Sequence, residues 1–132
     1  PVLDAVVFQM TDQLGAGDYT AALLTLQKLL KMQEPPIKIL GSIGAHFHRL
    51  SAARILSDHG KNYADLRKLM GITSDYTAKK AMEAARRFRP EFCAKAAELI
   101  LETDRQMKTS YDDNERLLEL LILRLAQEAK HG

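Results

Sequence analysis

The stretch "ADLRKLMGITSDYTAKKAMEAARRF", residues 64–88, is typical of two short helices joined by a turn. Gly71 interrupts the helical spacing, and Ser74 is a preferred residue at the start of a helix. The second helix is expected to end near Arg89, because Pro90 cannot continue it. Two helices joined in this way form the outline of a helix-turn-helix, which reads DNA in some proteins and is a packing unit in others.

The second helix of this stretch is expected to have a small, apolar inner face and a basic outer face. The inner face would carry Ala78, Ala81, Met82, Ala85 and Phe88. The outer face would carry Lys79, Lys80, Glu83, Arg86 and Arg87. Its four basic residues are candidates for weak contacts to phosphate, but no Asn, Gln or Ser is present there to read base edges. We therefore expect DNA binding to be weak and without sequence preference, and we favour a structural role for the motif.

The rest of the chain shows the same helical period, and no segment alternates as a strand would. Together with residues 64–89, it predicts an all-α, single-domain bundle of about seven helices. Asp18 and Asn62 are expected N-caps, and Pro35 and Pro36 can open the third helix. The apolar face of that helix consists of Leu40, Ile43, Phe47 and Leu50. The expected helices cover about residues 3–14, 19–30, 35–59, 63–70, 75–89, 90–109 and 114–130.

Composition restricts the function only a little. The net charge is +2, with 46% apolar and 27% charged residues, as in ordinary globular domains. The basic excess is concentrated in residues 61–90, which carry eight Lys or Arg against three Asp or Glu. The single cysteine, Cys93, excludes an intrachain disulfide, and no apolar run is as long as a membrane span. Because the chain begins at Pro1 and enters a helical pattern directly, we expect a fragment of a longer protein.

No group of residues indicates catalysis, a cofactor or a metal site. His46 and His48 are two residues apart and would face away from each other on a helix, while His59 and His131 have no matched partner. We expect all four histidines at the surface or at helix edges, and Cys93 as a small buried hydrophobe. A glycine-rich phosphate-binding loop is also missing. The domain is therefore not expected to be an enzyme.

The last helix carries more leucines than one core face requires. On a helical wheel, the core face consists of Leu118, Leu121, Ile122, Leu125, Ala126 and Ala129. Leu120 and Leu123 fall elsewhere, among Arg116, Arg124 and Gln127. A helix with apolar residues on a second face is either central in a bundle or in contact with another protein. We favour the second explanation, which makes these two leucines and two arginines a candidate subunit interface.

Three segments follow one another in an order that is typical of one protein family. The first is "LLTLQKLLKMQEPPIKILGSIGAHFHRLSAARIL", a helix pair with a break before a long helix. The second is "LRKLMGITSDYTAKKAMEAARRF", and the third is "AAELILETDRQMKTSYDDNERLLELLILRL". Their order and spacing resemble the C-terminal domain of the delta subunit of bacterial DNA polymerase III. The chain has Ser110 where this family often has a glycine, a difference that affects only a turn.

This resemblance implies that residues 1–132 are a helical C-terminal domain, and that an N-terminal ATPase-like module is missing from the fragment. In the family, that module opens the sliding clamp, and the C-terminal domains of five loader subunits join in a ring called the collar. The implied function is therefore subunit assembly in the clamp loader, without catalysis, metal or nucleotide. The implied partners are the delta prime and gamma/tau subunits, with the sliding clamp reached only through the missing part.

The resemblance also implies a place in the bacterial cytoplasm, at the replication fork. Two alternatives to the assembly function remain open. One is a DNA-binding regulator that uses residues 64–89. The other is a helical-repeat scaffold, because "GDYTAALLTLQKLL", residues 17–30, resembles the first helix of a tetratricopeptide unit. No second copy follows about 34 residues later, which favours an ordinary amphipathic helix.

Overall fold

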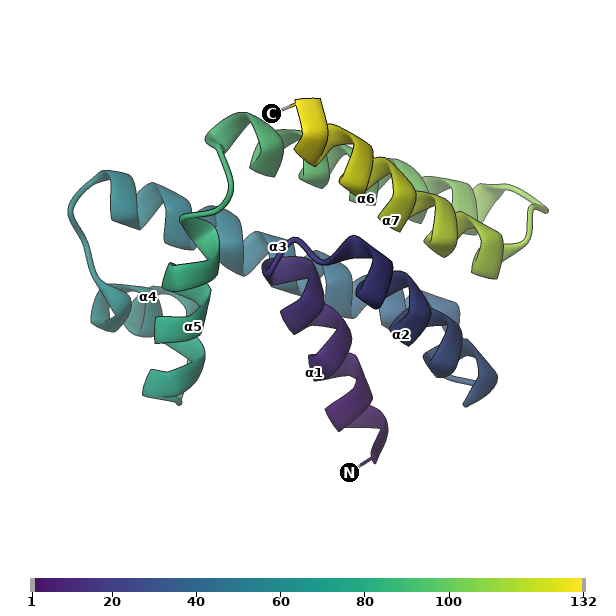
Figure 1. Cartoon of the computed structure of the whole chain (residues 1–132), viewed down its shortest axis with the longest axis horizontal. Coiled ribbons are helices and arrows are strands. Elements are labelled where there is room, and N and C mark those ends of the chain that lie inside the picture. Colours follow the sequence, from purple (N-terminus) through teal and green to yellow (C-terminus); the bar gives the residue numbers. More distant parts are fainter. Residues whose placement is uncertain (1, 132) are drawn as a thin grey trace.

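The computed structural model describes residues 2–131, in which seven helices and no strand are found. The helices are α1 (Val2–Gly15), α2 (Tyr19–Lys31), α3 (Pro36–Asp58), α4 (Tyr63–Met70), α5 (Asp75–Ala85), α6 (Pro90–Thr109) and α7 (Asn114–His131). The predicted all-α bundle of about seven helices is therefore confirmed (Figure 1).

One predicted boundary is wrong, because α5 ends at Ala85 and not near Arg89. The backbone N–H groups of residues 86–88 donate to carbonyls three residues earlier, in a turn tighter than an α-helix. Arg89 is extended, since the proline that follows it disfavours the helical conformation. The turn directs Phe88 into the core, where its ring stacks on that of Phe92 with 4.9 Å between centroids. Arg86 and Arg87 thus lie in a connection, not on a helix.

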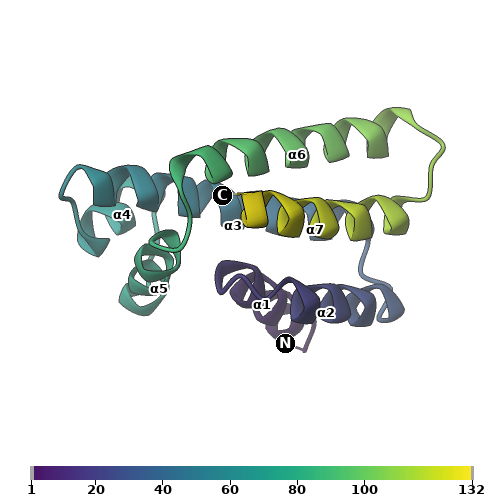
Figure 2. The same ribbon diagram turned by 45° about the horizontal axis from the view of Figure 1, so that its top comes forward.

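Helix α3 is the central element of the fold. It packs against α1, α4, α5, α6 and α7. Helices α4 and α5 lie together at one end of the molecule, while α6 and α7 form a long antiparallel pair (Figure 1). From a second direction, α6, α7 and α2 follow one another as layers (Figure 2). The α4–α5 unit therefore lies at one end of the bundle, where it packs against α3 and, through α5, against α1.

Two hydrophobic cores follow one another along α3. Its predicted apolar face, which is buried as expected, belongs to a large core shared with α1, α2, α6 and α7. Phe47 is 2% exposed, and its ring centroid lies 6.2 Å from those of both Phe88 and Phe92. Farther along α3, a small second core contains Ala53, Leu66, Ala78, Ala81 and Ala85. Because most of these side chains are single methyl groups, α4 and α5 can lie close to the end of α3.

Candidate functional site

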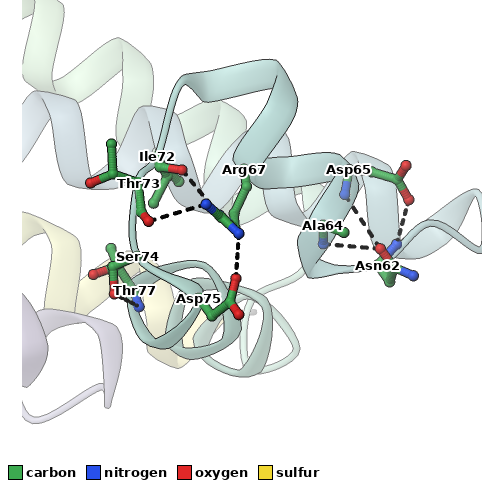
Figure 3. Close-up of polar contacts among 9 residues, drawn as sticks. All are labelled: Asn62, Ala64, Asp65, Arg67, Ile72, Thr73, Ser74, Asp75 and Thr77. Carbon is green, nitrogen blue, oxygen red and sulfur yellow. Dashed lines mark hydrogen bonds and ion pairs between the residues drawn. The ribbon is translucent and has the colours of Figure 1, made fainter.

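Local hydrogen bonds fix the start of α4 and the start of α5 (Figure 3). The Asn62 side chain accepts hydrogen bonds from the N–H groups of Ala64 and Asp65, and the Asp65 carboxylate accepts one from the N–H of Asn62. This reciprocal capping box satisfies donors that a helix start leaves free. Gly71 ends α4 in the left-handed conformation at φ 67°, which favours glycine. Ser74 caps α5, so all three predicted end signals of this unit are confirmed.

Arg67 joins the two helices through the turn between them (Figure 3). Its Nε donates to the carbonyl of Ile72 over 3.2 Å, and Nη2 donates to that of Thr73 over 3.1 Å. Its Nη1 forms an ion pair with Asp75 at the start of α5. One guanidinium thus holds two turn carbonyls and a carboxylate in fixed positions, and its charge is satisfied within the unit.

The four candidate phosphate contacts are all exposed, but they differ in what they already contact. Lys80 forms an ion pair with Asp12 of α1 at 2.8 Å, and hydrogen bonding to this carboxylate raises the pKa of the lysine. Arg87 donates to the carbonyl of Gly15 at the end of α1 over 3.3 Å. These two cations connect α5 and the turn after it to α1. These bonds indicate that Lys80 and Arg87, two of the four predicted phosphate contacts, have a structural role.

Lys79 and Arg86, the other half, have no carboxylate partner among residues 2–131. The Lys79 ammonium lies over the ring of Tyr63, 4.7 Å from its centroid. Both cations line a hollow of about 440 Å³ together with Lys61, which the sequence pattern did not identify. Lys61 lies in the connection before α4, 18 positions from Lys79, so no local spacing relates the two. The fold therefore brings Lys79 and Arg86 together with Lys61, and it directs Lys80 and Arg87 to α1.

Helix α5 is covered on two sides, which bears on the helix-turn-helix alternative. The predicted inner residues are buried, apart from the half-buried Met82. Ala84 is also buried, on the side of α5 that faces α1. A Cβ atom added to Gly15 of α1 would lie 3.5 Å from the Cβ atom of Ala84. A recognition helix needs a free face that enters the major groove. Because α1 flanks α5, the geometry favours the structural role of the motif.

The four residues of the candidate interface on α7 differ in their exposure and in their contacts. Leu118, Leu121, Ile122 and Leu125 are fully buried in the large core. Leu123 is 52% exposed, whereas Leu120 is half-buried. Arg116 forms an ion pair with Asp112 at 3.0 Å. Arg124 is exposed and lies near Glu102 of α6, whose pKa is lowered first by its hydrogen bond to Arg105 and also by the charge of Arg124. Leu123 is thus the clearest free apolar group of this set.

His46 differs from the exposed histidines, because its side chain is half-buried at the edge of α3. Its ring packs against Phe47 and the end of α1, where a Cβ on Gly15 would lie 3.3 Å from its Cε1. Burial, and next the charge of Arg49, lower its pKa to about 4, and its Nε2 is buried without a hydrogen-bond partner. The helical spacing correctly separated His46 from His48, but it could not show that the end of α1 covers the side of α3 that carries His46. His48 and His59 are exposed, and the side chain of His131 lies outside what the structure describes.

Within residues 2–131, no group of three or more His, Cys, Asp or Glu side chains could hold a metal ion. Cys93 is buried as predicted, and this burial raises the pKa of its thiol. Across the same residues, each helix is too short or too polar to cross a membrane.

Comparison with known proteins identifies the family. A family model described as DNA polymerase III delta subunit, C-terminal domain, matches residues 4–125. DNA polymerase III subunit delta of Bacillus subtilis (strain 168) is 28% identical over 123 residues, which are 93% of this chain and 35% of that protein. The solved structure of the Bacillus subtilis DNA clamp loader delta protein (YqeN) aligns with a TM-score of 0.84 and 27% identity, covering 95% of this chain and 37% of that one. The chain spans about a third of the length of these relatives. It belongs to the family of the C-terminal domain of the DNA polymerase III delta subunit.

Proposed function

We propose that the chain is a subunit-assembly domain, through which a DNA polymerase III delta subunit joins the other clamp-loader subunits in a collar. The neighbours would be delta prime and gamma/tau, and the sliding clamp would be contacted only by other parts of a longer delta subunit. The domain would carry out no reaction of its own. Family membership supports a place in the clamp loader, and the observation that carries the assembly role is the exposure of Leu123.

Leu123 is exposed in the middle of a helix whose other leucines are buried, apart from the half-buried Leu120. Leaving more than half of a leucine in water forgoes part of the roughly 2 kcal/mol that its burial supplies. Such a residue, flanked by the exposed Arg124, matches the pattern of an apolar anchor beside a charged rim. A contact with another subunit would bury it.

A ring also requires a second surface, because each subunit meets two neighbours through different faces. A groove of about 790 Å³ between α3 and α6 offers such a surface. Its walls include Leu101, which is 70% exposed, and Ile37, while Gly41 and Gly44 keep its floor open. The groove lies between α3 and α6, whereas Leu123 lies on α7. Two separate apolar surfaces on one small domain support membership in a closed ring.

Replacement of Leu123 by Ser tests the assembly role. We expect the variant to keep its melting temperature and to lose about tenfold in affinity for the other loader subunits, because one apolar anchor carries about 1–2 kcal/mol. Gln9→Ser is the control, at an exposed position of α1. Affinity is measured by sedimentation with delta prime and gamma, using a delta subunit that contains this chain.

The groove is tested separately with Leu101→Ser. Unchanged assembly of both the Leu123 and the Leu101 variant would contradict the proposed function. A loss with only one of them would assign the interface to α7 or to the groove. A collapse of the melting temperature in the Leu123 variant would instead show that this leucine belongs to the core.

A further inference from the structure

We propose that the hollow between the start of α4 and the outer face of α5 binds the phosphate groups of a nucleic-acid backbone. This site is independent of subunit assembly, which the exposed leucines of α6 and α7 would serve. The hollow of about 440 Å³ is lined by Lys61, Lys79 and Arg86, with Glu83 as its one acidic residue. Three cations therefore meet at one place, Lys61 from the connection before α4 and the other two from α5 and the residue that follows it.

The charges of these three residues are available to a ligand. Lys61, Lys79 and Arg86 are exposed, and none has a carboxylate partner among residues 2–131. Two other cations of the same region are neutralised, Lys80 by Asp12 and Arg67 by Asp75. The ammonium of Lys79 is held over the ring of Tyr63, a contact that positions the charge without neutralising it. The hollow therefore keeps a net positive charge that the fold itself does not use.

The lining favours a nucleic-acid backbone over an acidic protein. Protein interfaces place apolar and aromatic anchors at their centre and are poor in lysine, whereas nucleic-acid interfaces are strongly positive. Here three of the lining side chains are cations, and the two apolar ones, Met82 and Tyr63, are half-buried. Consecutive phosphates also carry their charges at a fixed spacing whatever the sequence. Several cations in one hollow fit such a ligand.

The same geometry indicates that binding does not depend on base sequence. The Asn62 side-chain oxygen, which could otherwise read a base edge, already accepts two backbone hydrogen bonds of the α4 cap. The ring of Tyr63 has Lys79 over it, so that face does not offer a free stacking surface to a base. Ser57 and the Asn62 amide group also line the hollow, but its positive charge comes from the three cations, which recognise phosphate.

The position of the hollow makes the proposal separable from assembly. It lies on α4 and α5, at the end of the molecule away from most of the α6–α7 pair (Figure 1). Helix α7 packs on α2, α3 and α6. Changes to the three cations therefore leave the proposed assembly surfaces untouched, and they also leave both cores intact.

The test compares two triple variants of the 132-residue chain that each lose three positive charges. The first is Lys61→Gln, Lys79→Gln and Arg86→Gln. The control is Lys28→Gln, Lys31→Gln and Lys130→Gln, on exposed positions of α2 and α7. Binding to mixed-sequence DNA of about 25 nucleotides, single-stranded or duplex, is measured by fluorescence anisotropy across a salt series. Circular dichroism melting confirms that each variant is folded.

We expect the hollow variant to lose about tenfold or more in affinity near 50 mM salt, and its salt slope on duplex to fall in magnitude by about 2–3. The control should lose much less. Glu83→Gln, which removes the one acidic residue of the hollow, should strengthen binding, and it tests the site should the triple variant fail to fold. A preference for single strands or duplex identifies which form supplies the phosphates.

Three results would overturn the proposal. Equal losses in the hollow and control variants would show an effect of net charge alone. A wild-type chain that binds neither DNA form at low salt would exclude the site. Unchanged DNA binding by the hollow variant, combined with weaker assembly with other loader subunits, would assign the hollow to an acidic protein surface instead.

Discussion

His46 makes the stability of this fold sensitive to mild acid. The side chain is half-buried against the end of α1, with its Nε2 enclosed, and its pKa falls from 6.5 to about 4. Burial is the main cause, the positive charge of Arg49 lowers the pKa further, and Asp12 acts in the opposite direction. The folded chain therefore keeps this histidine neutral at a pH where the unfolded chain binds a proton. Acid then favours the unfolded state.

The size of the effect follows from the difference between the two pKa values. The contribution of neutral His46 to the free energy of unfolding is fully present above pH 6.5. It is lost as the pH falls from 6.5 towards 4, and it no longer changes below pH 4. A difference of 6.5 against about 4 corresponds to about 3 kcal/mol in total. About 2 kcal/mol of this is lost between pH 7 and pH 5. Domains of this size have only about 5–15 kcal/mol of stability, so the loss is measurable.

The assay is urea unfolding at several pH values for the wild-type chain, His46→Gln and His48→Gln. Gln stays neutral, so His46→Gln removes the titration whatever it does to the absolute stability. His48 is exposed on the same helix and receives the same substitution as a control. Subtracting the curves of two variants cancels the carboxylates that protonate in the same range. The free energy of unfolding should fall less between pH 7 and pH 5 in the His46 variant than in the control.

Equal pH dependence in the two variants would refute this reasoning. It would mean that solvent reaches His46 in the folded chain, or that α1 separates from α3 without unfolding. Hydrogen exchange of α1 distinguishes the two cases, since separation would leave its amides unprotected near pH 5.

Two further predictions concern the packing of the fold. Phe47→Ala should cost about 3–5 kcal/mol in urea unfolding, because the ring is buried against Phe88 and Phe92, and a loss below about 1 kcal/mol would show that the site is not a packed core. Arg67→Ala should cost about 1–2 kcal/mol and speed hydrogen exchange in α4 and α5, because two turn carbonyls lose their donor. Lys68→Ala, at the exposed next position, is its control, and equal effects of the two would exclude the role of Arg67 in the turn.

The features that the sequence predicted correctly are determined by neighbours in the chain. Asp18, Asn62 and Ser74 each cap the helix that follows them, as predicted from residue type and position. The α3 face centred on Phe47 follows from a 3.6-residue period within one helix. Such signals need no knowledge of the tertiary structure. They are enough to define the helices and to place most of the core.

The features that the sequence could not predict depend on residues far apart in the chain. Lys80 pairs with Asp12 across 68 positions, so its outward placement on a helical wheel says nothing of its partner. His46 is covered by α1, an element that no local pattern places there. The early end of α5 reflects the burial of Phe88 beside Phe92 as well as the proline. In each case, packing between elements decides the outcome.

The candidate sites themselves are defined by what folding leaves unused. Among the basic residues near α5, Lys80 and Arg87 stabilise the contact with α1, whereas Lys79 and Arg86 remain without a carboxylate and meet Lys61. On α7, the large core takes up most of the leucines and leaves Leu123 exposed. A sequence pattern counts all cations or all leucines of a helix alike. Only the structure separates those that hold the fold together from those that are free to bind another molecule, and the two sets of substitutions proposed above change only the free ones.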